Sequence, residues 1–167
     1  MLKYVDTKVC FAEVPDEISL CINLSGCPHK CGGCHSPYLQ EDTGTVLTKT
    51  ELDSLIKSNK GITCVCFMGG DADIPALTTF ASYVQMEYKL KTAWYSGLTF
   101  HPSTSRPSGH FFDFIKTGPY MKQYGPLTNP NTNQRFYTKG TQMKKMDANP
   151  HMFYDTTDKF WRNDTDS

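Results

Sequence analysis

The sequence has no excess of either charge and no long apolar run. Its 167 residues carry 17 Lys and Arg against 17 Asp and Glu, so its net field gives no reason to expect tight binding to nucleic acid or to anionic membranes. No stretch approaches the roughly 20 consecutive apolar residues of a membrane span, and the start of the chain lacks the charged-then-apolar pattern of a signal peptide. We therefore expect no nucleic-acid partner, no membrane association and a cytoplasmic location.

The chain is also too short for two ordinary domains. We predict one domain over residues 1–140 and a loosely ordered tail over residues 141–167, which is rich in Lys, Asp, Asn and Thr. Aromatic residues of this tail could still dock on the domain: Phe153, Tyr154, Phe160 and Trp161.

Alternating strand and helix patterns run along most of the chain. Thr48 followed by Glu51 matches a helix capping box, and Asp73 can cap a second helix that has Pro75 in its first turn. Pro15-Asp16 is typical of a tight turn, whereas the many turn-forming residues of 101–110 leave no room for a crossover helix. We predict strands over 8–14, 17–24, 62–68, 92–96, 111–116 and 135–138, and helices over 49–58 and 73–88. This order indicates an α/β fold with a mainly parallel sheet.

Seven cysteines are many for a chain of this size, and their odd number argues against complete disulfide pairing. Four of them lie among apolar residues in strand-like runs, where a free cysteine packs as a small hydrophobe. We therefore predict that these four fill the core: Cys10, Cys21, Cys64 and Cys66.

The other three cysteines, Cys27, Cys31 and Cys34, share one loop with the spacing C-x3-C-x2-C. Thiolates select iron–sulfur centres or zinc over hard cations. A closed zinc site needs a fourth ligand, which would be His29 or His35. A 4Fe-4S cluster held by three thiolates instead leaves one iron open to an outside ligand. The spacing favours the cluster, and the zinc site remains the alternative.

Two further segments follow predicted strands. Gly69-Gly70-Asp71 ends one strand and Ser96-Gly97 ends the next. Because sites in parallel sheets lie at the carboxyl ends of strands, we expect both segments to share one edge with the cysteine loop.

The spacing of Cys27, Cys31 and Cys34, with Gly69-Gly70-Asp71 after the next strand, resembles the radical S-adenosylmethionine enzymes. This resemblance implies that the open iron binds the amino and carboxylate groups of S-adenosylmethionine. It also implies that the Gly-Gly-Asp segment contacts the methionine amine. Two glycines agree with that role, because they leave backbone carbonyls bare for close approach.

A more specific resemblance extends over residues 5–138, which resemble the activating proteins of anaerobic, class III ribonucleotide reductase. The segments that carry it are 16–27, 34–37, 93–97, 113–120 and 132–135. This resemblance implies a shortened, open, partial TIM-type βα barrel. It also implies a reaction in which one electron from the reduced cluster cleaves S-adenosylmethionine, and the resulting 5′-deoxyadenosyl radical takes hydrogen from a glycine of the large reductase subunit. An electron donor such as a flavodoxin would feed the cluster.

Several residues receive cofactor roles under this resemblance. Gly33 stands where many radical enzymes place an aromatic residue beside the adenine, and small activators often have glycine there. His35 could hydrogen-bond the cluster or the adenine. Ser96 could bond the carboxylate or the ribose, or simply form a turn, and Lys116 could steer the carboxylate or be a solvated lysine. Asp71 is one methylene shorter than the glutamate usual at its position.

Two alternatives remain within enzymes: activation of another glycyl-radical enzyme, such as pyruvate formate-lyase, and radical chemistry on a small molecule. A non-catalytic zinc module is the alternative from a different class.

Overall fold

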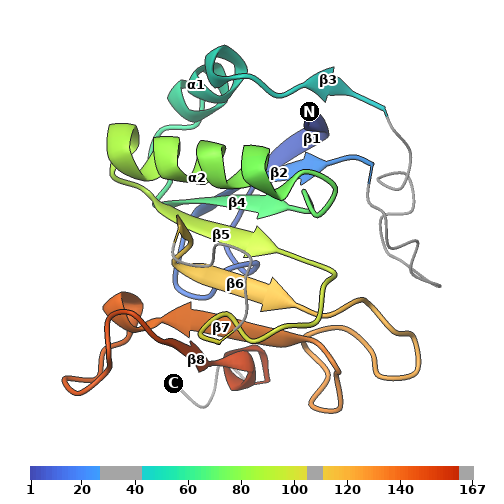
Figure 1. The fold of residues 1–167 in the computed structure, drawn as a ribbon, viewed down its shortest axis with the longest axis vertical. Helices are drawn as coiled ribbons and strands as arrows, with labels where there is room; N and C mark the ends of the chain where they lie inside the picture. The colour runs from blue at the N-terminus through green and yellow to red at the C-terminus, as the bar shows by residue number, and fades with distance from the viewer. Residues whose placement is uncertain (27–42, 105–110, 162–167) are drawn as a thin grey trace.

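The computed structural model describes residues 1–26, 43–104 and 111–161, and within them it contains one sheet and two α-helices (Figure 1). The helices are α1 (Lys49–Lys57) and α2 (Ile74–Tyr88), and two 3-10 turns, η3 (Gly140–Gln142) and η4 (Thr157–Phe160), follow later. The strands are β1 (Lys3–Cys10), β2 (Ser19–Leu24), β3 (Thr45–Val46), β4 (Cys64–Met68), β5 (Lys91–Tyr95), β6 (Phe114–Thr117), β7 (Arg135–Lys139) and β8 (Phe153–Asp155). None of the helices in the described ranges is long and apolar enough to cross a membrane.

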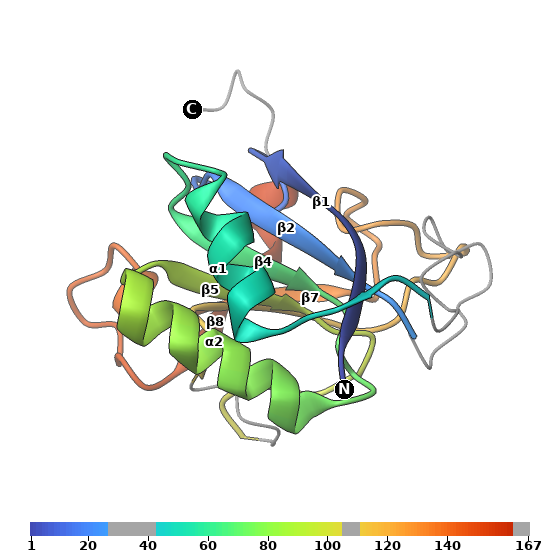
Figure 2. The same cartoon turned by 90° about the horizontal axis from the view of Figure 1, so that it is seen from above.

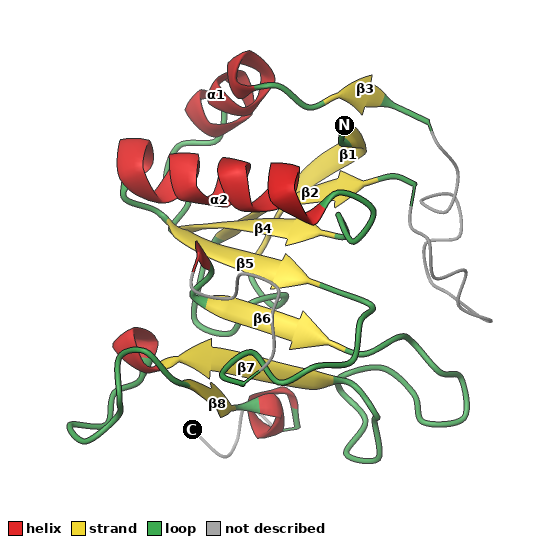
Figure 3. Cartoon of the chain, viewed as in Figure 1, coloured by secondary structure: helices red, strands yellow, loops and turns green. Residues whose placement is uncertain are grey.

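The sheet is open and mixed. Its order is β3-β1-β2-β4-β5-β6-β7-β8, with β3 and β8 at opposite edges (Figure 3). Parallel pairing joins only the central strands β2, β4, β5 and β6, whereas the outer pairs are antiparallel. The predicted α/β class is confirmed. The predicted shortened, open, partial barrel with mainly parallel strands is confirmed only in its openness. The described strands form an open sheet instead of a TIM-type barrel, and four of its seven pairings are antiparallel.

Both helices begin where the sequence predicts. The Thr48 hydroxyl accepts a hydrogen bond from the Glu51 amide at 3.1 Å, and Asp73 accepts one from the Ala76 amide at 3.3 Å. These side chains satisfy amides that the first turn leaves without partners. Pro75 lies in the first turn of α2, where a missing amide proton costs nothing.

The two helices pack on the same face of the sheet (Figure 2). Leu52 and Ile56 of α1 and Leu77 of α2 are buried there against alternate side chains of the central strands. The strand side chains in this core include Leu20, Ile22, Val65, Phe67, Trp94 and Ile115. In the strand predicted over 17–24, alternate side chains from Leu20 onward thus enter this core, whereas Ile18 precedes β2 and is 36% exposed.

The opposite face of the sheet holds the four cysteines predicted to fill the core. Cys10, Cys21, Cys64 and Cys66 are all buried and unpaired in disulfides. They pack with apolar side chains from the segments that cover this face, including Val14, Leu127 and Phe160. The prediction that they act as small core hydrophobes is confirmed.

The chain after residue 140 continues the sheet. β8 pairs with β7, and Phe153 is 4% exposed in the core beneath the helices. Phe160 packs on the opposite face against Phe136, with ring centroids 5.1 Å apart, and the Trp161 indole donates to the Leu127 carbonyl at 2.8 Å. These contacts extend the packed unit to residue 161, beyond the boundary that the polar composition of this segment suggested.

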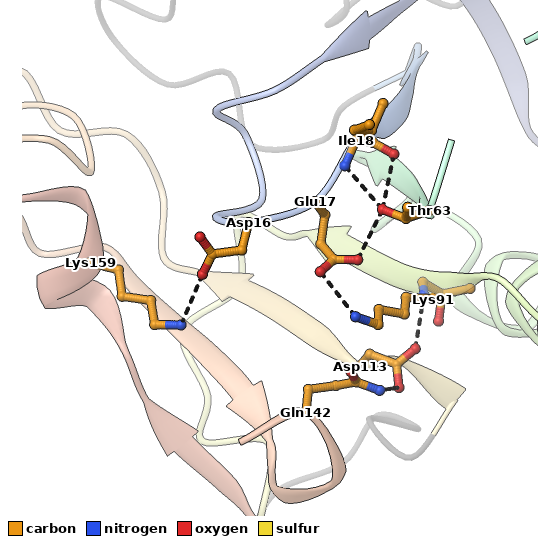
Figure 4. Close-up of polar contacts among 9 residues, drawn as sticks. Asp16, Glu17, Ile18, Thr63, Lys91, Asp113, Gln142 and Lys159 are labelled. Carbon is orange, nitrogen blue, oxygen red and sulfur yellow. Dashed lines mark hydrogen bonds and ion pairs between the residues drawn. The ribbon is translucent and has the colours of Figure 1, made fainter. Parts of the chain in front are cut away.

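A polar network ties the amino ends of the central strands together (Figure 4). The carboxylate of Glu17 accepts hydrogen bonds from the Thr63 hydroxyl and from Lys91 Nζ, each at 3.0 Å. The carboxylate of Asp113 accepts from the Thr92 amide at 2.9 Å and from Gln142 Nε2 at 3.2 Å. The network lies at the edge opposite to the strand ends where the site is predicted.

Asp113→Ala should destabilise the fold. The substitution leaves the fully buried Thr92 amide without its acceptor and also removes the bond to Gln142. Each buried donor left unpaired costs about 1–3 kcal/mol, so we expect the free energy of unfolding to fall by about 2–4 kcal/mol. Urea denaturation followed by circular dichroism measures it. Asp147→Ala, at an exposed position, is the control and should change stability by less than about 0.5 kcal/mol. Equal effects of the two substitutions would contradict the prediction.

Candidate functional site

The carboxyl ends of the central strands are aligned at one edge of the sheet. Asn23 pairs with Met68, Met68 with Tyr95, and Tyr95 with Lys116. The cysteine loop, the Gly-Gly-Asp segment and Ser96 therefore leave three neighbouring strands at the same level. The predicted shared edge is confirmed for the segments after β4 and β5 and for the point where the chain leaves β2.

The base of the cysteine loop is held between β1 and the chain that enters β3. The Ser25 amide donates to the Lys3 carbonyl at 2.9 Å, and the Ser25 hydroxyl donates to the Thr43 carbonyl at 2.5 Å. Gly26 follows with a φ of +73°, a value that favours glycine. Five predicted site residues lie outside the described residues: Cys27, Cys31, Gly33, Cys34 and His35.

Gly69 and Gly70 lie directly beside the start of that loop. Both have positive φ, +106° and +98°. A Cβ on Gly69 would come within 3.4 Å of the Leu24 carbonyl oxygen, and a Cβ on Gly70 within 3.1 Å of side-chain carbons of Leu24 and Leu77. The backbone conformation therefore favours glycine at both positions, and at Gly70 the close contacts with Leu24 and Leu77 favour it as well.

Asp71 joins the ends of β4 and β5. Its Oδ1 accepts a hydrogen bond from the Ser96 hydroxyl and its Oδ2 accepts one from the Gly97 amide, both at 2.8 Å. The Ser96 oxygen in turn accepts from the Leu98 amide at 3.0 Å. Asp71 and Ser96, predicted as separate cofactor contacts, thus form one bracket between two strand ends. The sequence did not reveal the part of Gly97, because a backbone amide carries no residue-specific signal.

Lys116 ends the same row on β6, with its side chain buried rather than solvated. It is 8% exposed, and its Nζ donates to the Gly118 carbonyl at 3.0 Å. The ammonium also lies 5.8 Å from the centre of the Tyr95 ring, an attractive distance for a cation over an aromatic face. Gln134 Nε2 donates to the same Gly118 carbonyl at 3.3 Å. A positive charge is thereby placed at the carboxyl edge of the sheet.

Three of the four core cysteines are poorly suited to bind metal, whereas a hydrogen bond with Cys66 lowers the pKa of the buried Cys21 thiol. Burial raises the pKa of the thiols of Cys64 and Cys66, and it raises that of Cys10 to about 12. A thiol must lose its proton to bind metal, and burial opposes that loss. Within residues 1–26, 43–104 and 111–161, no three His, Cys, Asp or Glu side chains are arranged to hold a metal ion. The candidate ligands are therefore those of the loop between β2 and β3.

Comparison with known protein families identifies the class of this site. The family model of the 4Fe-4S single cluster domain matches residues 18–138, which run from the start of β2 almost to the end of β7. The match covers well over half of the chain, so the chain belongs to the family of 4Fe-4S single cluster domains. Comparisons with curated proteins and with solved structures gave no match.

Gly70→Ala should destabilise the protein more than Gly61→Ala. The two glycines have similar positive φ, +98° and +90°, but a Cβ at Gly61 would meet no atom within 4 Å. Both substitutions therefore lose a similar free energy from the strained backbone. The difference between their losses of stability measures the cost of the contacts with Leu24 and Leu77 at Gly70. Overpacking a close contact costs about 1–3 kcal/mol, so we expect this extra loss for Gly70→Ala in urea denaturation. Equal losses of stability in the two variants would contradict the prediction, because Leu24 and Leu77 would then make room for the new methyl group without cost.

Proposed function

We propose that this member of the 4Fe-4S single cluster family is a radical S-adenosylmethionine activase that generates a glycyl radical on anaerobic ribonucleotide reductase. The observation that carries the proposal is the three-cysteine loop leaving β2 at the edge where Gly69-Gly70-Asp71 and Ser96 meet. Cys27, Cys31 and Cys34 are the proposed cluster ligands. The proposed cofactor segments follow neighbouring strands, within reach of one shared ligand.

The donor set fits a 4Fe-4S cluster. Thiolates are the ligands that iron–sulfur clusters prefer, and three of them leave one iron coordination position for another molecule. When bound, such a cluster supplies the electron for reductive cleavage of S-adenosylmethionine. The protein's part is to bind the cofactors, orient them and exclude competing reactions.

The residues beside the loop support distinct binding roles. Gly69 is half-buried and has no side chain, so we propose that a ligand amine approaches its backbone, whereas Gly70 is buried against Leu24 and Leu77. Asp71 has both carboxylate oxygens engaged by Ser96 and Gly97, so we propose that it positions the Gly-Gly backbone instead of serving as the main amine contact. The positive charge of Lys116 favours a carboxylate at the same edge. Gly33 and His35 are proposed neighbours of the adenine.

The proposed partners are the large subunit of anaerobic ribonucleotide reductase, as protein substrate, and an electron donor such as a flavodoxin, in the cytoplasm. A protein substrate suits this chain, because 167 residues leave little to build an enclosing pocket. The balance of 17 basic and 17 acidic residues gives nucleic acid no electrostatic advantage as a partner.

Anaerobic reconstitution should load about four irons per chain, and addition of dithionite and S-adenosylmethionine should then release 5′-deoxyadenosine. Cys31→Ala should lose both the iron and the product, since it removes a proposed ligand. Cys64→Ala is the matched control, because that thiol is buried in the core and has a raised pKa. It should keep both signals. Metal analysis and chromatography of the nucleoside give the two readouts.

Three outcomes would overturn the proposal or change its class. Uptake of one zinc without iron would indicate the zinc module, and cleavage that survives Cys31→Ala would refute the proposed ligand set. A glycyl signal by electron paramagnetic resonance on pyruvate formate-lyase, and none on the reductase, would assign the activity to the other partner.

Asp71→Ala should slow formation of 5′-deoxyadenosine while the iron content stays unchanged. The substitution removes two hydrogen bonds between β4 and β5, which would let the Gly-Gly backbone shift relative to the loop. A displacement of about 1 Å in a positioning element costs on the order of 100-fold in rate. Ser96→Ala removes only one of these bonds and should have the smaller effect. Loss of iron in Asp71→Ala would instead assign the residue to cluster binding.

A further inference from the structure

The last described turn of the chain lies on the sheet face opposite the helices. It consists of η4 and Trp161, and its Phe160 ring packs against the Phe136 ring with centroids 5.1 Å apart. Phe136 pairs with Lys116 on β6, and its ring centroid lies 6.2 Å from that of Tyr95. The turn therefore covers the strand next to the row of residues in which the candidate site ends.

The chain is joined to β7 through its backbone up to Thr157. The Thr156 amide donates to the Phe136 carbonyl, and the Phe136 amide donates to the Thr157 hydroxyl, both at 2.8 Å. Thr157 is fully buried, whereas Asp158 and Lys159 are exposed. The described chain thus changes its mode of attachment between Thr157 and Asp158.

Side-chain contacts hold the turn beyond this point. Lys159 Nζ lies 3.6 Å from the carboxylate of Asp16, and both side chains are exposed. The Trp161 indole donates to the Leu127 carbonyl at 2.8 Å, and the Arg135 guanidinium lies 5.8 Å from the centre of the Trp161 ring. Contacts of these kinds each contribute little stability. A unit held in this way can open locally while the sheet stays folded.

The turn lies at the end of the site that is farthest from the cysteine loop. The strand order sets the exit of β2 at one end of the row, the Gly-Gly-Asp segment and Ser96 in the middle, and β6 and β7 at the other end. Under the proposed function the cluster lies at the β2 end and S-adenosylmethionine over the middle strands. The β6 and β7 end is then left for a protein substrate, and the turn covers it.

We propose that residues 158–161 form a strap that opens after Thr157 and gives way to the glycine-bearing segment of the protein substrate. An extended segment with one apolar side chain suits this surface, because Phe160 then leaves an aromatic contact on Phe136 and Trp161 leaves the Leu127 carbonyl as an acceptor. The closed strap lowers the fraction of chains that are competent to bind this substrate, which weakens the apparent affinity. The inference rests on the proposed function, whereas opening of the strap is measured without it.

Hydrogen exchange of the reconstituted full chain measures the opening. The Lys159 and Trp161 amides bond within the turn, to the carbonyls of Thr156 and Asp158, whereas the Thr156 amide bonds to Phe136 of β7. We expect the first two amides to exchange at least about 100-fold faster than the third, because they need only local opening. Equal exchange at the three amides would show that the strap opens only with the sheet and would overturn the proposal.

Phe160→Ala provides the test of function. It removes the ring that docks on Phe136, so the strap should open more often and the KM for the reductase should fall on the order of 10-fold. Formation of the glycyl radical, followed by electron paramagnetic resonance at several reductase concentrations, gives this KM. Release of 5′-deoxyadenosine without the reductase should stay unchanged. A KM that is unchanged or raised, while the Lys159 and Trp161 amides exchange faster, would refute the strap and assign Phe160 to packing alone.

Charge exchange tests the anchor at Asp16. Lys159→Asp sets two carboxylates against each other and should lower the KM for the reductase on the order of 3-fold, and Asp16→Lys should act in the same direction. The double variant restores the pair and should return to the KM of the unaltered chain. Asp16 has a φ of +69°, so any strain from the new lysine is common to the single and the double variant. Lys145→Asp, at an exposed position outside the strap, is the control of equal charge change and should leave the KM unaltered.

The strap and the proposed function fail in different ways. An unaltered chain that loads iron but releases no 5′-deoxyadenosine would refute the proposed function and, with it, the assignment of the substrate. Hydrogen exchange would still decide whether the strap opens. A chain that makes the glycyl radical with the same KM in Phe160→Ala and Lys159→Asp would refute the strap and leave the proposed function standing.

Discussion

The parallel pairing of β2, β4 and β5 is the constraint on which the rest of the molecule depends. Parallel strands end at the same edge, so three segments that are far apart in the chain meet there: the start of the cysteine loop, the Gly-Gly-Asp turn and Ser96-Gly97. The Asp71 carboxylate then fixes two of these ends to each other. The opposite edge carries the polar network of Glu17 and Asp113, which holds the amino ends in place. One edge is thereby devoted to stability and the other is free to carry chemistry.

The two faces of the sheet are built differently. Helices and large side chains such as Phe67 and Trp94 fill one face, where the amphipathic stripes of α1 and α2 need a broad apolar surface. The other face is covered by connecting segments and contains the small cysteine side chains. Small residues let these segments approach the strands closely without a helix between them. The asymmetry explains why two α-helices suffice for the described part of the chain.

Local patterns predicted the elements better than their arrangement. The helices were predicted because Thr48 and Asp73 are capping residues and the apolar spacing is regular. The sequence also predicted that Asp71 and Ser96 lie at the same edge, because both follow strands, but it did not predict the hydrogen bond between them. β8 was missed because Phe153–Asp155 is too short for a periodic signal and owes its strand form to pairing with β7. The antiparallel pairs at the β7 and β8 side of the sheet were not foreseen, since the direction of a strand is set by its connection and not by its composition. The buried state of Lys116 likewise depends on Gly118 and Tyr95, which only the fold brings to it.

The four core thiols have a consequence for how a holoprotein can be assembled. In the folded chain all four are buried, and burial raises the pKa of the thiols of Cys10, Cys64 and Cys66, so these three compete poorly with the loop thiols for iron. In the unfolded chain all seven cysteines are equally accessible, and metal bound to the unfolded state opposes folding. Misligated chains would then have to release iron before the strands that contain Cys21, Cys64 and Cys66 could pair. The order of events therefore matters for assembly: the sheet must fold and bury the core cysteines before iron binds to the loop.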